Sequence, residues 1–241
     1  MIKKFFLIFS VLILIMPFGA QAATQSINRI YIGYINDKYP VEFNINYKSN
    51  TIDGSYFYAK VKKKIVLKGS IVNSHIMLNE YSGNKITAKL DLTEKDNTLK
   101  GEWITADKSK KYKVYLQEIF NNLPGYSKYS GHYETPDNYR IDIFYLGNNK
   151  AKIQGEAYWQ GVNPENIHTG VIADIVDIKN NAIHYTDGED EYSCKLDIKY
   201  LSPSKIQVKD NYQCGGMNVS FDGIYTRKSL RTGSWDLFMG Y

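Results

Sequence analysis

Short runs of alternating apolar and polar residues follow one another along most of the chain. In residues 41–47 every second position is apolar or aromatic and the positions between are Glu or Asn, a period of two that is typical of a strand with one buried face. The other runs of the first half have the same character, and turn residues such as Asn73-Ser74 and Asp96-Asn97 separate them. The pattern predicts strands over residues 31–35, 41–47, 56–61, 65–71, 75–80, 86–92, 99–104 and 112–116, with a turn at 50–54.

Residues 121–128 interrupt this pattern with an Asn-Asn pair, Leu-Pro-Gly and Ser, a composition typical of a linker. Alternation then resumes in residues 129–228. Short strands at about ten-residue spacing with short connections predict an all-β protein, built as two small antiparallel meander β-barrels or sandwiches in tandem. Residues 23–120 and 129–228 would form the two domains. Strands are predicted here over residues 139–144, 151–159, 170–178, 182–185, 191–200, 205–209 and 217–225.

The start of the chain has the order of a secretory signal peptide. Lys3 and Lys4 are followed by the almost unbroken apolar residues 5–18 and then by the small-x-small sequence Ala20-Gln21-Ala22. The apolar run is shorter than the roughly 20 residues that span a bilayer. We therefore expect residues 1–22 to be removed, a mature chain that starts at Ala23 without a transmembrane segment, and a periplasmic or secreted location.

The charge of the chain is moderate but unevenly distributed. The formal charge is +5 at pH 7, and removal of Lys3 and Lys4 with the signal peptide leaves +3. Residues 23–122 contain 16 basic and 10 acidic side chains, whereas residues 123–241 contain 12 basic and 15 acidic ones. A net charge this small does not favour nucleic acid as a partner. The opposite signs fit either two domains that attract each other or a drift in surface composition.

Cys194 and Cys214 are the two cysteines of the chain. In an oxidising compartment a lone pair most often forms a disulfide, which here would close a loop of about 20 residues and stabilise the fold by roughly 3 kcal/mol. Structural zinc requires four ligands, and the four histidines show no ligand spacing with each other or with the cysteines. No metal and no cofactor are therefore predicted.

Several short motifs of glycine and aromatic residues, in both halves of the chain, resemble those of exported bacterial β domains. The first half is similar to a class of bacterial exported β domains of unassigned activity, and the second half resembles another exported module that ends in Cys-Gly-Gly and Phe-x-Gly-x-Tyr. The resemblance implies a β architecture and says little about activity, because turn glycines and core aromatics make up the motifs. The motifs are Gly54-Ser55-Tyr56-Phe57-Tyr58, Leu67-Lys68-Gly69, Leu78-Asn79-Glu80-Tyr81, Gly101-Glu102-Trp103 and Cys214–Arg227.

Two features are candidates for a binding surface. Lys62, Lys63 and Lys64 lie in a basic run at residues 60–64 which, if it folds next to the basic run at 108–113, could bind an acidic partner or an anionic envelope polymer. Solvated turns beside strands are the alternative. Trp159 precedes a polar loop at 161–166 and is the best candidate for an exposed aromatic, whereas Trp103 is expected in the core.

No residues are predicted to be catalytic. His132 and His168 lie next to glycines and near acidic residues, but no nucleophile motif accompanies them. The acidic turn at residues 187–191 does not have the spacing of a calcium loop and is expected to be solvated. The apolar C-terminal residues 229–241, which include Trp235, are expected to pack on the second domain or to offer a docking segment.

These observations predict an exported, non-enzymatic β module that binds or inhibits a protein or an envelope component. The ligand, the partner and the oligomeric state are left open. One alternative is an enzyme that acts on envelope glycans, which needs two carboxylates facing each other in a cleft. Another is a barrel that carries a small apolar ligand, although barrels of this size are usually filled by their own side chains.

Overall fold

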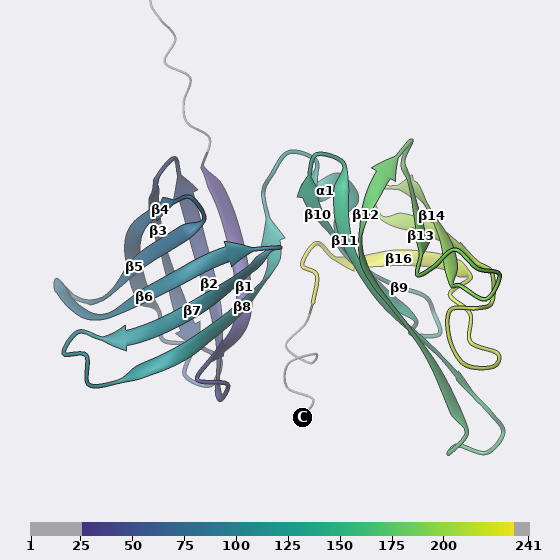
Figure 1. Ribbon diagram of the computed structural model, residues 1–241, viewed down its shortest axis with the longest axis horizontal. Coiled ribbons are helices and arrows are strands. Elements are labelled where there is room, and N and C mark those ends of the chain that lie inside the picture. Colours follow the sequence, from purple (N-terminus) through teal and green to yellow (C-terminus); the bar gives the residue numbers. More distant parts are fainter. Residues whose placement is uncertain (1–25, 234–241) are drawn as a thin grey trace, which may run out of the picture.

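The computed structural model describes residues 26–233, and two closed antiparallel barrels lie side by side in it (Figure 1). The predicted signal peptide and Trp235 lie outside the described residues. Barrel 1 comprises β1 (Ile27–Ile35), β2 (Tyr39–Lys48), β3 (Thr51–Tyr58), β4 (Ile65–Val72), β5 (His75–Ser82), β6 (Lys85–Lys95), β7 (Thr98–Thr105) and β8 (Lys111–Asn121). Barrel 2 comprises β9 (Gly131–Glu134), β10 (Arg140–Gly147), β11 (Lys150–Gln160), β12 (Ile167–Lys179), β13 (Ala182–Thr186), β14 (Lys195–Ser202), β15 (Lys205–Asp210) and β16 (Gly223–Ser229).

Each barrel is a meander in which every strand pairs with the next and the last strand pairs with the first. β8 closes barrel 1 against β1, and β16 closes barrel 2 against β9. Several hairpins turn through two residues with positive φ, such as Asp96 and Asn97 at 48° and 56°. This conformation matches the twist of antiparallel strands and favours Asn and Asp. The tandem all-β architecture predicted from the alternation is therefore confirmed.

The inward positions of barrel 1 form a continuous apolar core. Phe43, Tyr56 and Leu67 are among its fully buried side chains. Where two strands approach very closely the inward residue is glycine: a Cβ on Gly69 would lie 1.8 Å from the backbone oxygen of Met77 on β5. The glycines of the sequence motifs thus allow the sheet to curve into a narrow barrel.

Barrel 2 is closed less regularly. β12 pairs with β11 from Ile167 to Asp177 but with β13 only at Ile178 and Lys179. The irregular segment 211–222 lies against the other end of β12, where Gly216 N–H donates to the Thr169 carbonyl at 3.1 Å. The predicted disulfide between Cys194 and Cys214 is present and ties this segment to the start of β14.

Several details of the strand prediction are wrong. Residues 51–54 belong to β3 instead of a turn, because β3 pairs with β2 from Thr51 onward. Residues 191–194 and 217–222 are not strands: the Asp190 carboxylate accepts from Tyr192 N–H at 2.9 Å, and Asp210 accepts from Phe221 N–H at 2.6 Å, which stabilises loops in both places. The four-residue β9 was not predicted, although it closes barrel 2.

The predicted linker holds the short helix α1 (Tyr126–Tyr129), and contacts around this helix fix the barrels to each other. The Tyr126 hydroxyl donates to the Ile119 carbonyl on β8 at 3.0 Å and lies 3.1 Å from the Leu230 carbonyl. Thr232 N–H also donates to Ile119, at 2.9 Å. The structure describes residues 229–233 of the predicted C-terminal tail. Ser229 ends β16, and residues 230–233 pack between the barrels.

Candidate functional site

The most distinctive charged surface lies at one end of barrel 1. In a meander, alternate loops lie at the same end, so the β1–β2, β3–β4, β5–β6 and β7–β8 connections gather there. We call this surface the lysine end and define it by residues 36–38, 59–64, 83–85 and 106–111. Its exposed lysines are Lys38, Lys60, Lys62, Lys63, Lys64, Lys85, Lys108, Lys110 and Lys111.

Few acidic groups offset these nine lysines. The lysine end contains Asp37 and Asp107 as its acidic residues. Hydrogen bonds from Thr105 and Ser109 lower the pKa of Asp107 to about 2, so its carboxylate is ionised and already bound to groups of its own turn. Among the nine lysines, Lys111 is the one in an ion pair with a described residue, at 2.7 Å from Glu102. A strong positive potential is therefore expected over this end.

A polar network inside the barrel lies beneath these loops. The buried Glu80 carboxylate accepts three hydrogen bonds: from the Tyr56 hydroxyl at 2.6 Å, the Trp103 indole at 2.8 Å and the Thr87 hydroxyl at 2.7 Å. Trp103 also stacks on Tyr112 with ring centroids 5.6 Å apart. Trp103 is thus packed against the core as predicted, and the network gives the lysine loops a rigid base.

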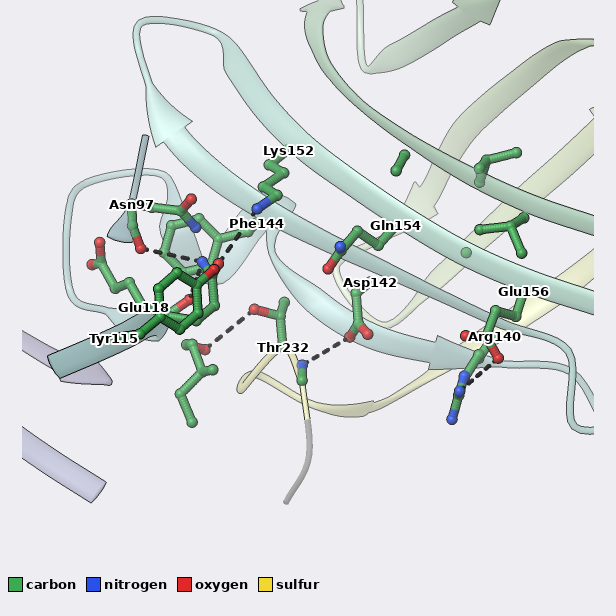
Figure 2. Close-up of a pocket in the computed structure, with 17 residues that line it drawn as sticks. Asn97, Tyr115, Glu118, Arg140, Asp142, Phe144, Lys152, Gln154, Glu156 and Thr232 are labelled. Atoms are coloured by element: carbon green, nitrogen blue, oxygen red, sulfur yellow. Dashed lines mark hydrogen bonds and ion pairs between the residues drawn. The ribbon is translucent and has the colours of Figure 1, made fainter. Parts of the chain in front are cut away.

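A second candidate is a cleft of about 320 Å³ between the barrels, shown in Figure 2. It lies between the outer faces of β8 and of β10 to β12, at the level of the Asp96-Asn97 turn. Its labelled lining residues are Asn97, Tyr115, Glu118, Arg140, Asp142, Phe144, Lys152, Gln154, Glu156 and Thr232.

Charged groups on the cleft walls are largely paired within the protein. Arg140 donates to Glu156 at 2.6 Å. His132 bridges two carboxylates, with Nδ1 at 3.0 Å from Asp142 and Nε2 at 2.8 Å from Glu134. The hydrogen bond to Asp142 raises the pKa of His132 despite its partial burial, which favours a charged imidazolium in this position.

The other predicted site residues lie apart from the lysine end. The Trp159 ring is half-buried: it packs against the core of barrel 2 and contacts the His168 ring, with centroids 5.2 Å apart and planes tilted by 37°. In the acidic turn, Asp187 accepts from Cys194 N–H at 2.8 Å and Asp190 from Ser193 Oγ at 2.8 Å, which gives these carboxylates a structural role. Lys62, Lys63 and Lys64 are the predicted residues that fall within the larger charged surface.

Across residues 26–233, no group of three or more His, Cys, Asp or Glu side chains is arranged to hold a metal ion. The same part of the chain contains no helix with the length and apolar character needed to cross a bilayer. A disulfide is consistent with an extracellular location, because such bonds persist in oxidising compartments.

Sequence reasoning missed the cleft, since its walls come from residues far apart in the chain that meet only after folding. Comparisons with protein-family models, with curated proteins and with solved structures gave no match to this chain. The resemblance to bacterial exported β domains therefore stays a prediction, and the function must be inferred from the chain's own geometry.

Proposed function

We propose that this protein is an exported, non-enzymatic module that binds an anionic polymer of the cell envelope through the lysine end. The observation that carries this proposal is the collection of nine exposed lysines, against two aspartates, on four loops that the meander places together. Clustered charges of one sign attract polyanions and raise their rate of encounter.

The composition of this surface favours a polymer over an acidic protein. Interfaces between proteins usually have an aromatic or apolar core, and lysine is depleted from them. The exposed apolar groups at the lysine end are few, with Val61 and the neighbouring Tyr39 as the largest. Flexible lysines on separate loops suit a ligand that repeats its negative charges along a chain.

The test uses residues 23–241 in oxidised form and immobilised dextran sulfate, with uncharged dextran as the reference matrix. The triple variant Lys62→Ser/Lys63→Ser/Lys64→Ser should bind about 100-fold more weakly, if each lysine contributes the roughly 1 kcal/mol found near anionic lipid surfaces. Binding should also weaken as salt shortens the Debye length from about 10 Å at 0.1 M.

A matched control removes the same charge from barrel 2. Lys195, Lys199 and Lys205 are exposed, and their combined replacement by Ser should leave binding within about twofold. Equal losses in both triple variants would show a non-specific charge effect and refute the assignment to the lysine end. Binding to polyglutamate without binding to dextran sulfate would shift the assignment to an acidic protein.

A further inference from the structure

The cleft between the barrels contains a buried amide that has no partner among the described residues. The Asn97 side chain is 8% exposed, and neither its Nδ2 nor its Oδ1 has a hydrogen-bond partner there. Leaving such a group unpaired costs about 1–3 kcal/mol. Most buried polar atoms in folded proteins are hydrogen-bonded, so an exception needs a physical reason.

The backbone holds Asn97 in a defined position. Its carbonyl accepts hydrogen bonds from Glu118 N–H at 2.9 Å and from Gln117 Nε2 at 3.1 Å. Its φ of 56° lies in the left-handed region, where Asn is favoured among residues with a side chain. The amide is therefore presented at the cleft by a rigid turn, as expected for a group that orients a ligand.

The polar groups around Asn97 offer both donors and acceptors. Lys152 Nζ lies 3.4 Å from Gln117 Oε1, a long contact that leaves the ammonium able to donate elsewhere. Gln154 lies on the same strand as Lys152 and also lines the cleft (Figure 2). Hydroxyl groups both donate and accept hydrogen bonds, and they can therefore match such a mixed set.

The cleft does not select strongly for a charged ligand. On its walls the cations Arg140 and Lys152 are balanced by Asp142 and Glu156, and Arg140 is already paired with Glu156. The remaining acidic lining residue, Glu118, is buried, and burial raises its pKa to about 7, which reduces its charge near neutral pH. An anion would approach Asp142, and a cation would approach Lys152. A neutral ligand avoids both repulsions.

Two aromatic rings complete the lining. Tyr115 is 37% exposed, and Lys100 lies over its ring with Nζ 5.1 Å from the centroid. Phe144, on the outer face of β10, also lines the cleft (Figure 2), but it is 4% exposed and packs edge-to-face on Tyr126. Small-molecule sites commonly combine such apolar surfaces with a few fixed polar groups and form where two domains meet.

We propose that the cleft between the barrels binds a neutral, hydroxyl-rich ligand of the saccharide class, with the Asn97 amide as its central hydrogen-bonding group. The hydroxyls would pair with Asn97, Gln154 and Lys152, and the C–H face of a sugar ring would pack against Tyr115. A volume of about 320 Å³ lies at the lower end of the range for small-molecule sites, which suits one or two sugar units.

The test titrates ¹⁵N-labelled residues 23–241 with two neutral probes, maltose and N,N′-diacetylchitobiose, and follows the side-chain amide signals by NMR. The Asn97 and Gln154 signals should shift in a saturable manner with at least one probe. Asn97→Gly keeps the left-handed turn and removes the amide, and it should weaken binding about tenfold, the effect of one or two hydrogen bonds. Ser74→Gly, at the equivalent position of another hairpin with φ of 64°, should bind as the unchanged chain does.

Absence of saturable shifts, or equal affinities for Asn97→Gly and Ser74→Gly, would overturn the inference. Amide shifts that occur only with a sulfated saccharide would overturn the choice of a neutral ligand. The lysine-end triple variant should bind maltose or chitobiose normally, and Asn97→Gly should bind dextran sulfate normally. Failure of one proposal can thus be told apart from failure of the other.

Discussion

Glu118 provides a quantitative test of the structure because its carboxyl group is buried with incomplete compensation. The side chain is 3% exposed. Burial raises its pKa from an ordinary 4.5 to about 7, although Arg29, at 3.7 Å, and a hydrogen bond from Asn121 oppose the increase. This difference in pKa corresponds to about 3 kcal/mol between the protonated and ionised forms.

The sign of the effect follows from proton binding. Between pH 4.5 and about 7 the unfolded chain has lost the Glu118 proton while the folded chain retains it, so the free energy of unfolding falls as pH rises. The contribution is fully present below pH 4.5 and is lost above about pH 7. Glu118→Gln keeps the shape of the side chain and cannot ionise, and it should lack this part of the pH dependence.

The assay is urea unfolding of residues 23–241 and of Glu118→Gln at several pH values between about 4.5 and 8. The free energy of unfolding of the variant, relative to the unchanged chain, should rise by about 3 kcal/mol across this range. His132, whose pKa is raised chiefly by its hydrogen bond to Asp142, also favours the folded state at low pH. Both proteins carry it, so it cancels in the difference. A difference that stays constant within about 0.5 kcal/mol would refute the reasoning.

Three further predictions concern stability, each measured by urea unfolding. Glu80→Ala leaves one buried and two partly buried donors without their acceptor and should lower stability by about 3–5 kcal/mol; a loss below about 1 kcal/mol would contradict the network. Replacing Cys194 and Cys214 by Ser should cost roughly 3 kcal/mol, and reduction of the unchanged chain should reproduce that loss. Gly69→Ala should cost about 1–3 kcal/mol, because its Cβ would meet a backbone oxygen at 1.8 Å, whereas the adjacent exposed Ser70→Ala should change stability by less than about 0.5 kcal/mol.

The fold was largely predictable because its signals are local. Alternation along residues 41–47 and paired turn residues such as Asp96-Asn97 mark strands and hairpins without information from the rest of the chain. β9 was missed because four residues are too few to show a period of two. Residues 217–222 have the composition of a strand, but the carboxylate of Asp210 and the disulfide hold this segment as a loop.

The candidate sites were predictable only in part. The lysine run at 62–64 was recognisable, and a meander topology alone places Lys38, Lys85 and the run at 108–111 at the same end. Sequence reasoning considered the run at 108–113 as a neighbour only conditionally and did not include Lys38 or Lys85, although every strand needed for this step had been predicted. The Asn97 amide gave no such signal, because an asparagine in a turn sequence does not show that a second barrel will pack over it in the folded protein.

The placement of the two proposed sites follows from the same topology. The Asp96-Asn97 turn connects β6 to β7 and lies at the opposite end of barrel 1 from the lysine end. Residues 23–241 carry a formal charge of +3, and the lysine end carries +7 from nine lysines and two aspartates, so the rest of this segment carries −4. A polyanion is therefore attracted to one end and repelled by the remainder. Contact through the lysine end would then leave the cleft, with its nearly balanced charges, open to a neutral ligand.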